Sequence, residues 1–317
     1  MDFVDRLDPE LAAVLPTIPR LDLTDLAAAR AEHRELAAKA RARWTPPSAV
    51  SWADRTVPGL HDDADVRLRI YTPEVRRDSV AVLYWMHGGG HVMGELGQDD
   101  RLLCEIVEVT GAICVSVDLR WSPEAPYPAS LDDSLAGLYW VHDHAAELGI
   151  DPTRIVVGGA SSGGGLAAGL ALRNRDEQRV DLGGQILICP MLDDRQRPDS
   201  ADVDHPLVWN RASNRIAWQA YLRETPGDDV PPYAAPARAA NLGGLPRTWI
   251  AAAGLDLFVD EDLDYARRLI AAGVPTELHV YPGAMHGFDL FAPHAAVSQR
   301  FLAERTAALQ RFLAPTS

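Results

Sequence analysis

The sequence is poor in positive charge, in cysteine and in long apolar runs, and each shortage excludes a class of protein. The 317 residues carry a formal net charge of −15, and Lys39 is the single lysine. Nucleic acids and anionic membrane surfaces are therefore not expected as partners, because both repel negative charge. The sequence contains no run of about 18 apolar residues, so no membrane span is expected.

The few cysteines exclude a disulfide scaffold. Cys104, Cys114 and Cys189 are scattered through apolar segments and lack the spacing of metal ligands. We expect three buried thiols and no metal site. The first residues are acidic and lack the pattern of a secretory signal, which favours a cytoplasmic location. With 47% hydrophobic and 24% charged residues, the composition is that of a globular protein.

A glycine-rich segment around Ser161 is the most informative part of the chain. The apolar residues 155–157 run into the motif G-A-S-S-G at 159–163, and small residues that suit a helix follow. A G-x-S-x-G motif between a strand and a helix predicts a nucleophile elbow, a strained turn that exposes the serine hydroxyl. Ser162 is an alternative nucleophile, but it lies outside the frame of the motif.

Two residues further along the chain can activate this serine. A serine hydroxyl needs a base, and the base needs an acid that orients it. Asp256 follows a predicted strand at 247–253, and His286 lies in a glycine-rich loop after a predicted strand at 276–281. Strand ends of a parallel sheet meet at one edge, so these residues are expected to converge on Ser161. Asp260 is the alternative acid, but Asp256 lies nearer the strand end.

The run His87-Gly88-Gly89-Gly90 follows a predicted strand at 80–86. Consecutive glycines allow backbone N–H groups to point at one oxygen atom without obstruction from Cβ atoms. Such donors stabilise the oxyanion of a tetrahedral intermediate. We predict that the N–H groups of Gly88, Gly89 and Ser162 form this oxyanion hole.

Two other interpretations of these motifs are weaker. Residues 163–168 also fit the dinucleotide pattern G-x-G-x-x-A, but the glycines would begin inside the helix rather than in the turn. His87 and His91 have a four-residue spacing that suits a metal, but they lie in a glycine loop rather than on one helix face. The sequence contains no Gly-Lys-Ser/Thr, which excludes a Walker loop.

Taken in order, the motifs resemble those of the hormone-sensitive-lipase-like branch of the α/β-hydrolases, the bacterial carboxylesterases with an H-G-G-G motif. The resemblance spans about residues 54 to 312 and includes D-L-R-W-S-P-E at 118–124. It implies an α/β-hydrolase fold, with a mostly parallel central sheet, helices on both faces and a helical cap. Two departures concern substrate preference: His91 replaces a bulky apolar residue, and Ala160 replaces an acidic neighbour of the nucleophile.

The resemblance implies a serine carboxylic-ester hydrolase that acts on small esters with short to medium acyl chains and needs no cofactor. Hydrolysis of an amide, lactone or carbamate by the same triad stays open as an alternative. So does a member of the superfamily that binds a ligand without turnover. The resemblance also implies a homodimer formed through the last edge strand, near residues 276–281.

The expected organisation places a cap over an α/β core. Residues 1–48 form N-terminal cap helices, 49–190 the first part of the core, 191–240 a cap insertion and 241–317 the second part of the core. Candidate substrate contacts are His91, Trp209, Trp218, Tyr221 and Phe288. For the three aromatic residues of the insertion, an alternative role is to pack the cap onto the core.

Strands and helices are expected to alternate from residue 80 onward, which predicts a parallel sheet. A helix at 24–43 and two antiparallel strands within 51–72 precede this part, with Arg67, Arg69 and Tyr71 on the half-exposed face. The later strands are expected at 80–86, 112–118, 154–158, 184–189, 247–253 and 276–281. The helices are expected at 98–110, 129–146, 162–175, 209–223, 259–272 and 294–313.

Overall fold

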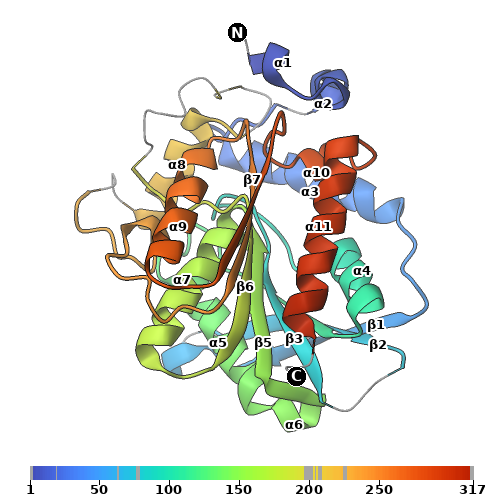
Figure 1. Ribbon diagram of the computed structural model, residues 1–317, viewed down its shortest axis with the longest axis vertical. Helices are drawn as coiled ribbons and strands as arrows, with labels where there is room; N and C mark the ends of the chain where they lie inside the picture. Colours follow the sequence, from blue (N-terminus) through green and yellow to red (C-terminus); the bar gives the residue numbers. More distant parts are fainter. Residues whose placement is uncertain are drawn as a thin grey trace.

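An eight-stranded sheet lies between two layers of helices in the computed structural model of the protein (Figure 1). The structure describes residues 3–18, 20–62, 64–75, 79–195, 203, 205, 209–223 and 227–314. Strands β3 to β8 run parallel to one another, whereas β1 and β2 pair antiparallel at one end of the sheet. The strand order is β1-β2-β4-β3-β5-β6-β7-β8. The strands are β1 (Val50–Val57), β2 (Val66–Pro73), β3 (Val80–Met86), β4 (Ile113–Val117), β5 (Ile150–Ala160), β6 (Leu182–Ile188), β7 (Thr248–Ala253) and β8 (Thr276–Tyr281).

The central strands are apolar along their whole length because helices cover both of their faces. In β3, Val82, Tyr84 and Met86 join the core on one face of the sheet. The alternate residues Leu83 and Trp85 join the core on the other face. This alternation follows from the two-residue period of a strand.

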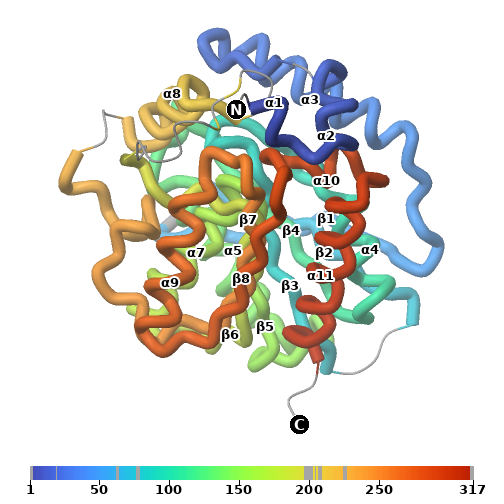
Figure 2. The backbone as a smooth tube through the Cα atoms, turned by 45° about the horizontal axis from the view of Figure 1, so that its top comes forward, coloured from blue at the N-terminus to red at the C-terminus, as the bar shows by residue number. Residues whose placement is uncertain are grey.

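Helices α5, α7 and α9 cover one face of the sheet, and α4 and α11 cover the other (Figure 1). The short helices α1 and α2, with α3 and α8, gather at the end of the sheet where the parallel strands finish (Figure 2). The helices are α1 (Phe3–Arg6), α2 (Pro9–Val14), α3 (Leu26–Ala42), α4 (Asp100–Thr110), α5 (Ala129–Asp143), α6 (Ala145–Leu148), α7 (Ser162–Glu177), α8 (Arg211–Leu222), α9 (Val259–Ala271), α10 (Phe288–Phe291) and α11 (Ala296–Leu313).

The expected cap is described in part. Residues 196–202, 204, 206–208 and 224–226 of the predicted insertion lie outside the described residues. Its helix α8 begins after Asn210, whose side-chain oxygen accepts a hydrogen bond from the Ser213 N–H and so caps the helix. Within the described ranges, no helix has both the length and the apolar character needed to cross a membrane.

Three local expectations were wrong. The helix predicted at 129–146 divides at His144 into α5 and α6, and α10 was not predicted. Tyr71 is fully buried rather than half-exposed, because its hydroxyl donates a 2.6 Å hydrogen bond to Asp100 Oδ1 under α4. The alternation of the strand places Tyr71 on the same face as Arg67 and Arg69, but the hydrogen bond to buried Asp100 keeps the Tyr71 side chain out of solvent.

Candidate active site

Ser161 occupies a strained turn between β5 and α7. Its backbone angles, φ 56° and ψ −125°, lie where a non-glycine residue is rarely found, and such strain is typical of functional turns. The turn is held by a hydrogen bond from the Ser161 N–H to Ile188 O at 2.8 Å. A Cβ atom on Gly159 would lie 2.2 Å from Gly163 O, and one on Gly163 would lie 2.1 Å from Met86 O. Only glycine fits these two positions of the motif.

The structure brings Ser161, His286 and Asp256 together in one hydrogen-bonded chain. His286 Nε2 lies 3.0 Å from Ser161 Oγ, and His286 Nδ1 lies 2.5 Å from Asp256 Oδ2. Asp256 follows β7 and His286 follows β8, and the two loops are joined by a hydrogen bond from the Leu255 N–H to Ala284 O at 2.8 Å. A serine, an imidazole and a carboxylate bonded in this order can serve as nucleophile, base and acid in acyl transfer.

The surroundings of His286 set its protonation. Burial alone lowers the pKa of the imidazole, but the charge and the hydrogen bond of Asp256 outweigh burial, and the net pKa is raised. Asp256 is itself 1% exposed, so its carboxylate acts with little screening by water. Phe258 meets the imidazole edge-to-face at 5.2 Å and limits its rotation. His286 is thereby held with its Nε2 aimed at Ser161 Oγ.

The glycine loop at 87–90, called the oxyanion loop below, lies directly beside Ser161. A Cβ atom on Gly88 would lie 3.3 Å from Ser161 Cβ, and Gly89 has a φ of 134° that favours glycine. The His87 Nδ1–H donates to Gly88 O at 2.8 Å, and burial lowers the pKa of His87 to about 4, so the ring is neutral. Ser162 is the first residue of α7, where a helix leaves its N–H groups without an internal partner.

The five candidate substrate contacts lie in three places. Trp209 lies over the oxyanion loop, since a Cβ atom on Gly90 would come within 2.3 Å of its ring, and the Trp209 and His286 ring centres are 6.5 Å apart. His91 packs with two further candidates on α8, Trp218 and Tyr221. Phe288 differs: its buried ring packs on Tyr281 and Phe301, which are core residues on the far face of the sheet.

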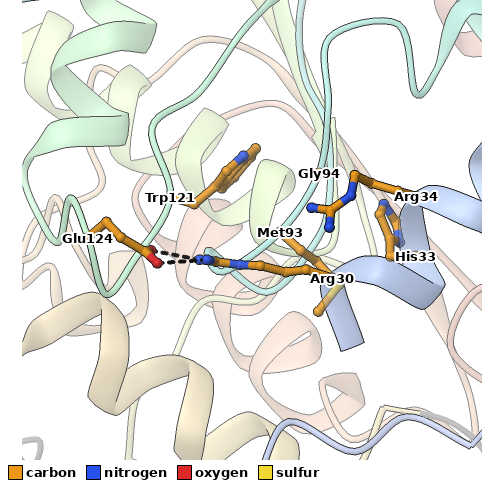
Figure 3. Close-up of a pocket in the computed structure, with 7 residues that line it drawn as sticks. All are labelled: Arg30, His33, Arg34, Met93, Gly94, Trp121 and Glu124. Carbon is orange, nitrogen blue, oxygen red and sulfur yellow. Dashed lines mark hydrogen bonds and ion pairs between the residues drawn. The ribbon is translucent and has the colours of Figure 1, made fainter. Parts of the chain in front are cut away.

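Arg30 joins α3 to the chain that follows the oxyanion loop. Its guanidinium donates to Val92 O and Ser122 O, both at 2.7 Å, and pairs with both oxygens of Glu124 at 2.8 Å. Figure 3 shows this pair at the side of a pocket of about 290 Å³ that contains none of the triad residues. The pocket is lined by Arg30, His33, Arg34, Met93, Gly94, Trp121 and Glu124.

One group of residues of the types that bind metals lies close together in the described part of the chain. It consists of Cys189, Asp256 and His286, whose possible ligand atoms lie within 4.8 Å of one another. The short bond between Asp256 and His286 already uses the facing atoms of that pair. Burial raises the pKa of the Cys189 thiol well above its usual value, which disfavours the thiolate that a metal requires. These contacts favour the triad predicted from the sequence over a metal site for Asp256 and His286.

Sequence reasoning missed three residues that support the site. Phe258 packs on His286, Arg30 holds the loop, and Glu261 accepts a 2.6 Å hydrogen bond from the Leu192 N–H beside the elbow. Phe258 lies two residues after Asp256, which was the one available signal. The partners of Arg30 and Glu261 lie more than sixty residues away, and no local pattern marks them.

Comparison with known proteins shows the family to which this chain belongs. A family profile described as alpha/beta hydrolase fold matches residues 83–290. The chain belongs to the α/β-hydrolase family. The carboxylesterase NlhH of Mycobacterium tuberculosis is 37% identical to it, with 97% of this chain and 96% of that protein covered. The esterase LipI of the same organism is 36% identical, with 90% and 89% covered.

Solved structures of other α/β-hydrolases have the same fold. A bacterial heroin esterase superposes with a TM-score of 0.95 at 42% identity, covering 98% of this chain and 99% of that one. The esterase LipW of Mycobacterium marinum has a TM-score of 0.89 at 37% identity, with 98% of each chain covered. The predicted fold and the resemblance to hormone-sensitive-lipase-like carboxylesterases are confirmed.

Proposed function

We propose that the protein is a serine carboxylic-ester hydrolase that acts on small esters with short to medium acyl chains. The hydrogen-bonded chain from Asp256 through His286 to Ser161 Oγ carries this proposal. The names of relatives such as the carboxylesterase NlhH and the esterase LipI support the ester as the bond that is cleaved.

In the first half of the reaction, Ser161 Oγ attacks the acyl carbonyl while His286 Nε2 takes its proton. Asp256 holds the imidazole through Nδ1 and stabilises the imidazolium that forms. The N–H groups of Gly88, Gly89 and Ser162 stabilise the oxyanion, and the loss of one such donor typically lowers kcat about 10²- to 10³-fold. His286 then protonates the leaving alcohol.

In the second half, water replaces the alcohol. His286 takes a proton from the water, whose oxygen attacks the acyl carbon of the acyl-enzyme. The same N–H groups hold the second oxyanion, and the proton returns to Ser161 Oγ as the carboxylic acid leaves. No cofactor enters this scheme. We propose that the cap, residues 1–48 with 191–240, covers the site and limits the depth of the acyl pocket.

The test is a p-nitrophenyl ester series from acetate to long chains, with wild type and Ser161→Ala. We expect rates that are highest for short and medium chains in the wild type and near background in the variant. Equal, near-background rates for both proteins would contradict the ester proposal. Activity on amides, lactones or carbamates, or binding without turnover, would then be examined.

The exposed edge strand of the sheet supports a proposal on assembly, and the buried cysteines support a proposal on location. β8 ends the sheet, so its outer backbone groups are available to pair with a second copy. We propose that two copies of the chain form a homodimer through this strand. We also propose that the substrate is a small ester and that the protein does not bind nucleic acid. Cys104, Cys114 and Cys189 are buried and unpaired, which suits a reducing, cytoplasmic environment.

A further inference from the structure

Three arginines of α3 lie on one face of the helix, toward the chain that follows the oxyanion loop. Arg30, Arg34 and Arg41 are four and seven residues apart in sequence, which is about one and two turns of a helix. Arg30 forms an ion pair with Glu124 at 2.8 Å. Arg41 forms one with Glu95 at the same distance. Arg34, the middle arginine, pairs with no carboxylate among the described residues. This face of α3 therefore presents one guanidinium that the described carboxylates leave unpaired.

Arg34 lines the pocket of about 290 Å³ that lies beside α3. Figure 3 shows its side chain extending from the helix toward the middle of the pocket, on the side that faces Trp121. The pocket opens to solvent, because Arg34 and Glu124 are both exposed. Its volume is close to the lower end of the range for small-molecule sites, about 300–1,000 Å³. The pocket therefore has room for a ligand with one ring.

The walls opposite Arg34 are flat or apolar. Trp121 is half-buried, and its indole packs on His87 with ring centres 4.7 Å apart. Gly94 has a φ of 139°, and a Cβ atom there would lie 2.1 Å from His87 Cε1 and 3.0 Å from Trp121 Cζ2, so this wall carries no side chain of its own. Met93 adds a thioether to the lining. Indole and thioether groups both pack well on aromatic rings, so these walls suit an aromatic ligand.

The charges around the pocket determine the polar end of such a ligand. Arg30 and Glu124 neutralise each other through two hydrogen bonds, and His33 Nε2 is already bonded to Gln98 Oε1 at 2.9 Å. Arg34 is then the one positive charge that is left over. A guanidinium can bind a carboxylate through two parallel hydrogen bonds. A dianion would keep one unpaired negative charge near Glu124, in a chain whose net charge is already −15, so a single negative charge fits best.

We propose that Arg34, Trp121 and Met93 form a second binding site, outside the candidate active site, for an aromatic monocarboxylate. The carboxylate pairs with the Arg34 guanidinium, and the ring packs on the indole and the thioether. The ligand thus supplies to Arg34 the group that Glu124 and Glu95 supply to the other two arginines. No residue of the proposed triad lines this pocket. The inference does not depend on the proposed ester hydrolysis, because binding is measured without turnover.

The test is an NMR titration with benzoate of protein isotope-labelled at its tryptophan indole nitrogens. The eight tryptophans give separate indole N–H signals, and Trp121→Phe identifies the signal of Trp121 by its loss. Benzoate should shift this signal, and the titration gives Kd. Benzamide has the same ring without the charge, so it should bind about fivefold more weakly than benzoate, which is typical of the loss of one partly exposed ion pair.

Arg34→Gln removes the charge and should weaken benzoate binding about fivefold for the same reason. Arg34→Lys keeps the charge but loses the planar fork, so its Kd should lie between those of the wild type and Arg34→Gln. Arg43→Gln is the matched control, because Arg43 is exposed at the end of the same helix and does not line the pocket. Its Kd should equal that of the wild type.

Three results would overturn the proposed carboxylate site. The first is a Trp121 signal that does not shift at millimolar benzoate. The second is the same Kd for benzoate in the wild type and in Arg34→Gln, or the same Kd for benzoate and benzamide in the wild type. The third is a shift confined to the signal of Trp209, identified with Trp209→Phe, because the Trp209 ring lies 6.5 Å from that of His286 and benzoate would then occupy the candidate active site.

Discussion

At the scale of single residues, the chemistry of the site depends on how Asp256 sets the state of His286. Two effects act in opposite directions on the pKa of the His286 imidazole. Burial lowers this pKa, and the nearby carboxylate of Asp256 raises it more strongly. Only the neutral imidazole can take the proton of Ser161. Activity should therefore rise with pH as His286 loses its proton.

Asp256→Asn should change both the rate and its pH dependence. The carboxylate that raises the pKa of His286 is removed and burial remains, so the acid limb of kcat/KM should move to lower pH. The amide also favours the wrong tautomer, and kcat should fall about 10⁴-fold. The measurement is kcat/KM against pH, with Asp260→Asn, one turn away, as the control. An acid limb that stays in place or moves to higher pH would contradict this account.

The proximity of the three proposed triad residues was predictable, because each follows a strand within a glycine-rich turn. Ser161 lies between Gly159 and Gly163, Asp256 comes two residues after Gly254, and His286 precedes Gly287. The orientation of His91 was not predictable. It depends on a left-handed backbone angle and on two aromatic residues more than a hundred positions away in the sequence.

At the scale of elements, α7 packs against the end of β3 so closely at Gly163 that no side chain can be placed there. A Cβ atom on Gly163 would lie 2.1 Å from Met86 O and 2.5 Å from His87 O. Met86 ends the strand that leads into the oxyanion loop. Displacing this contact would move the nucleophile and the oxyanion donors relative to each other.

Gly163→Ala should therefore lower the free energy of unfolding by about 1–3 kcal/mol through overpacking. It should also lower kcat by more than it changes KM. Gly227→Ala is the control, because no atom of the described residues lies within 4 Å of the added methyl group, and its stability should stay within about 0.5 kcal/mol of the wild type. Urea unfolding measures the free energy of unfolding of both variants, and steady-state kinetics measure kcat and KM. Equal stability of the two variants would show that the helix and strand can separate at no cost.

Element boundaries could be predicted where the pattern is simple. β3 and β8 begin and end at the predicted residues, because each is a short run bounded by charged or turn-forming residues. The break between α5 and α6 was missed. His144 caps α5 through a 2.8 Å bond from its ring to Trp140 O, and this local bond competes with continuation of the helix.

At the scale of the whole molecule, one edge of the sheet is formed by a parallel strand. β8 lies at this edge and is partly exposed along most of its length. Exposed edge strands pair readily unless charge or a bulge prevents it. Val280, 38% exposed on this strand, is an apolar residue at the proposed dimer contact.

Sedimentation should give about twice the mass of one chain for the wild type if β8 pairs as proposed. Val280→Lys places a charge on the edge strand and should shift the equilibrium toward the monomer, because opposed like charges destabilise strand pairing. Val75→Lys is the control, since Val75 is 83% exposed just after β2. A monomeric wild type, or two variants that sediment alike, would contradict dimerisation through β8.

The central claim is that Ser161 is the nucleophile that His286 activates. Its most direct test is reaction with diethyl p-nitrophenyl phosphate, followed by peptide mass spectrometry to locate the attached group. We predict one diethylphosphoryl group per chain, on Ser161 and not on Ser162, with activity lost in proportion to labelling and no labelling of Ser161→Ala. Labelling at another residue, or full activity with Ser161 modified, would contradict the account.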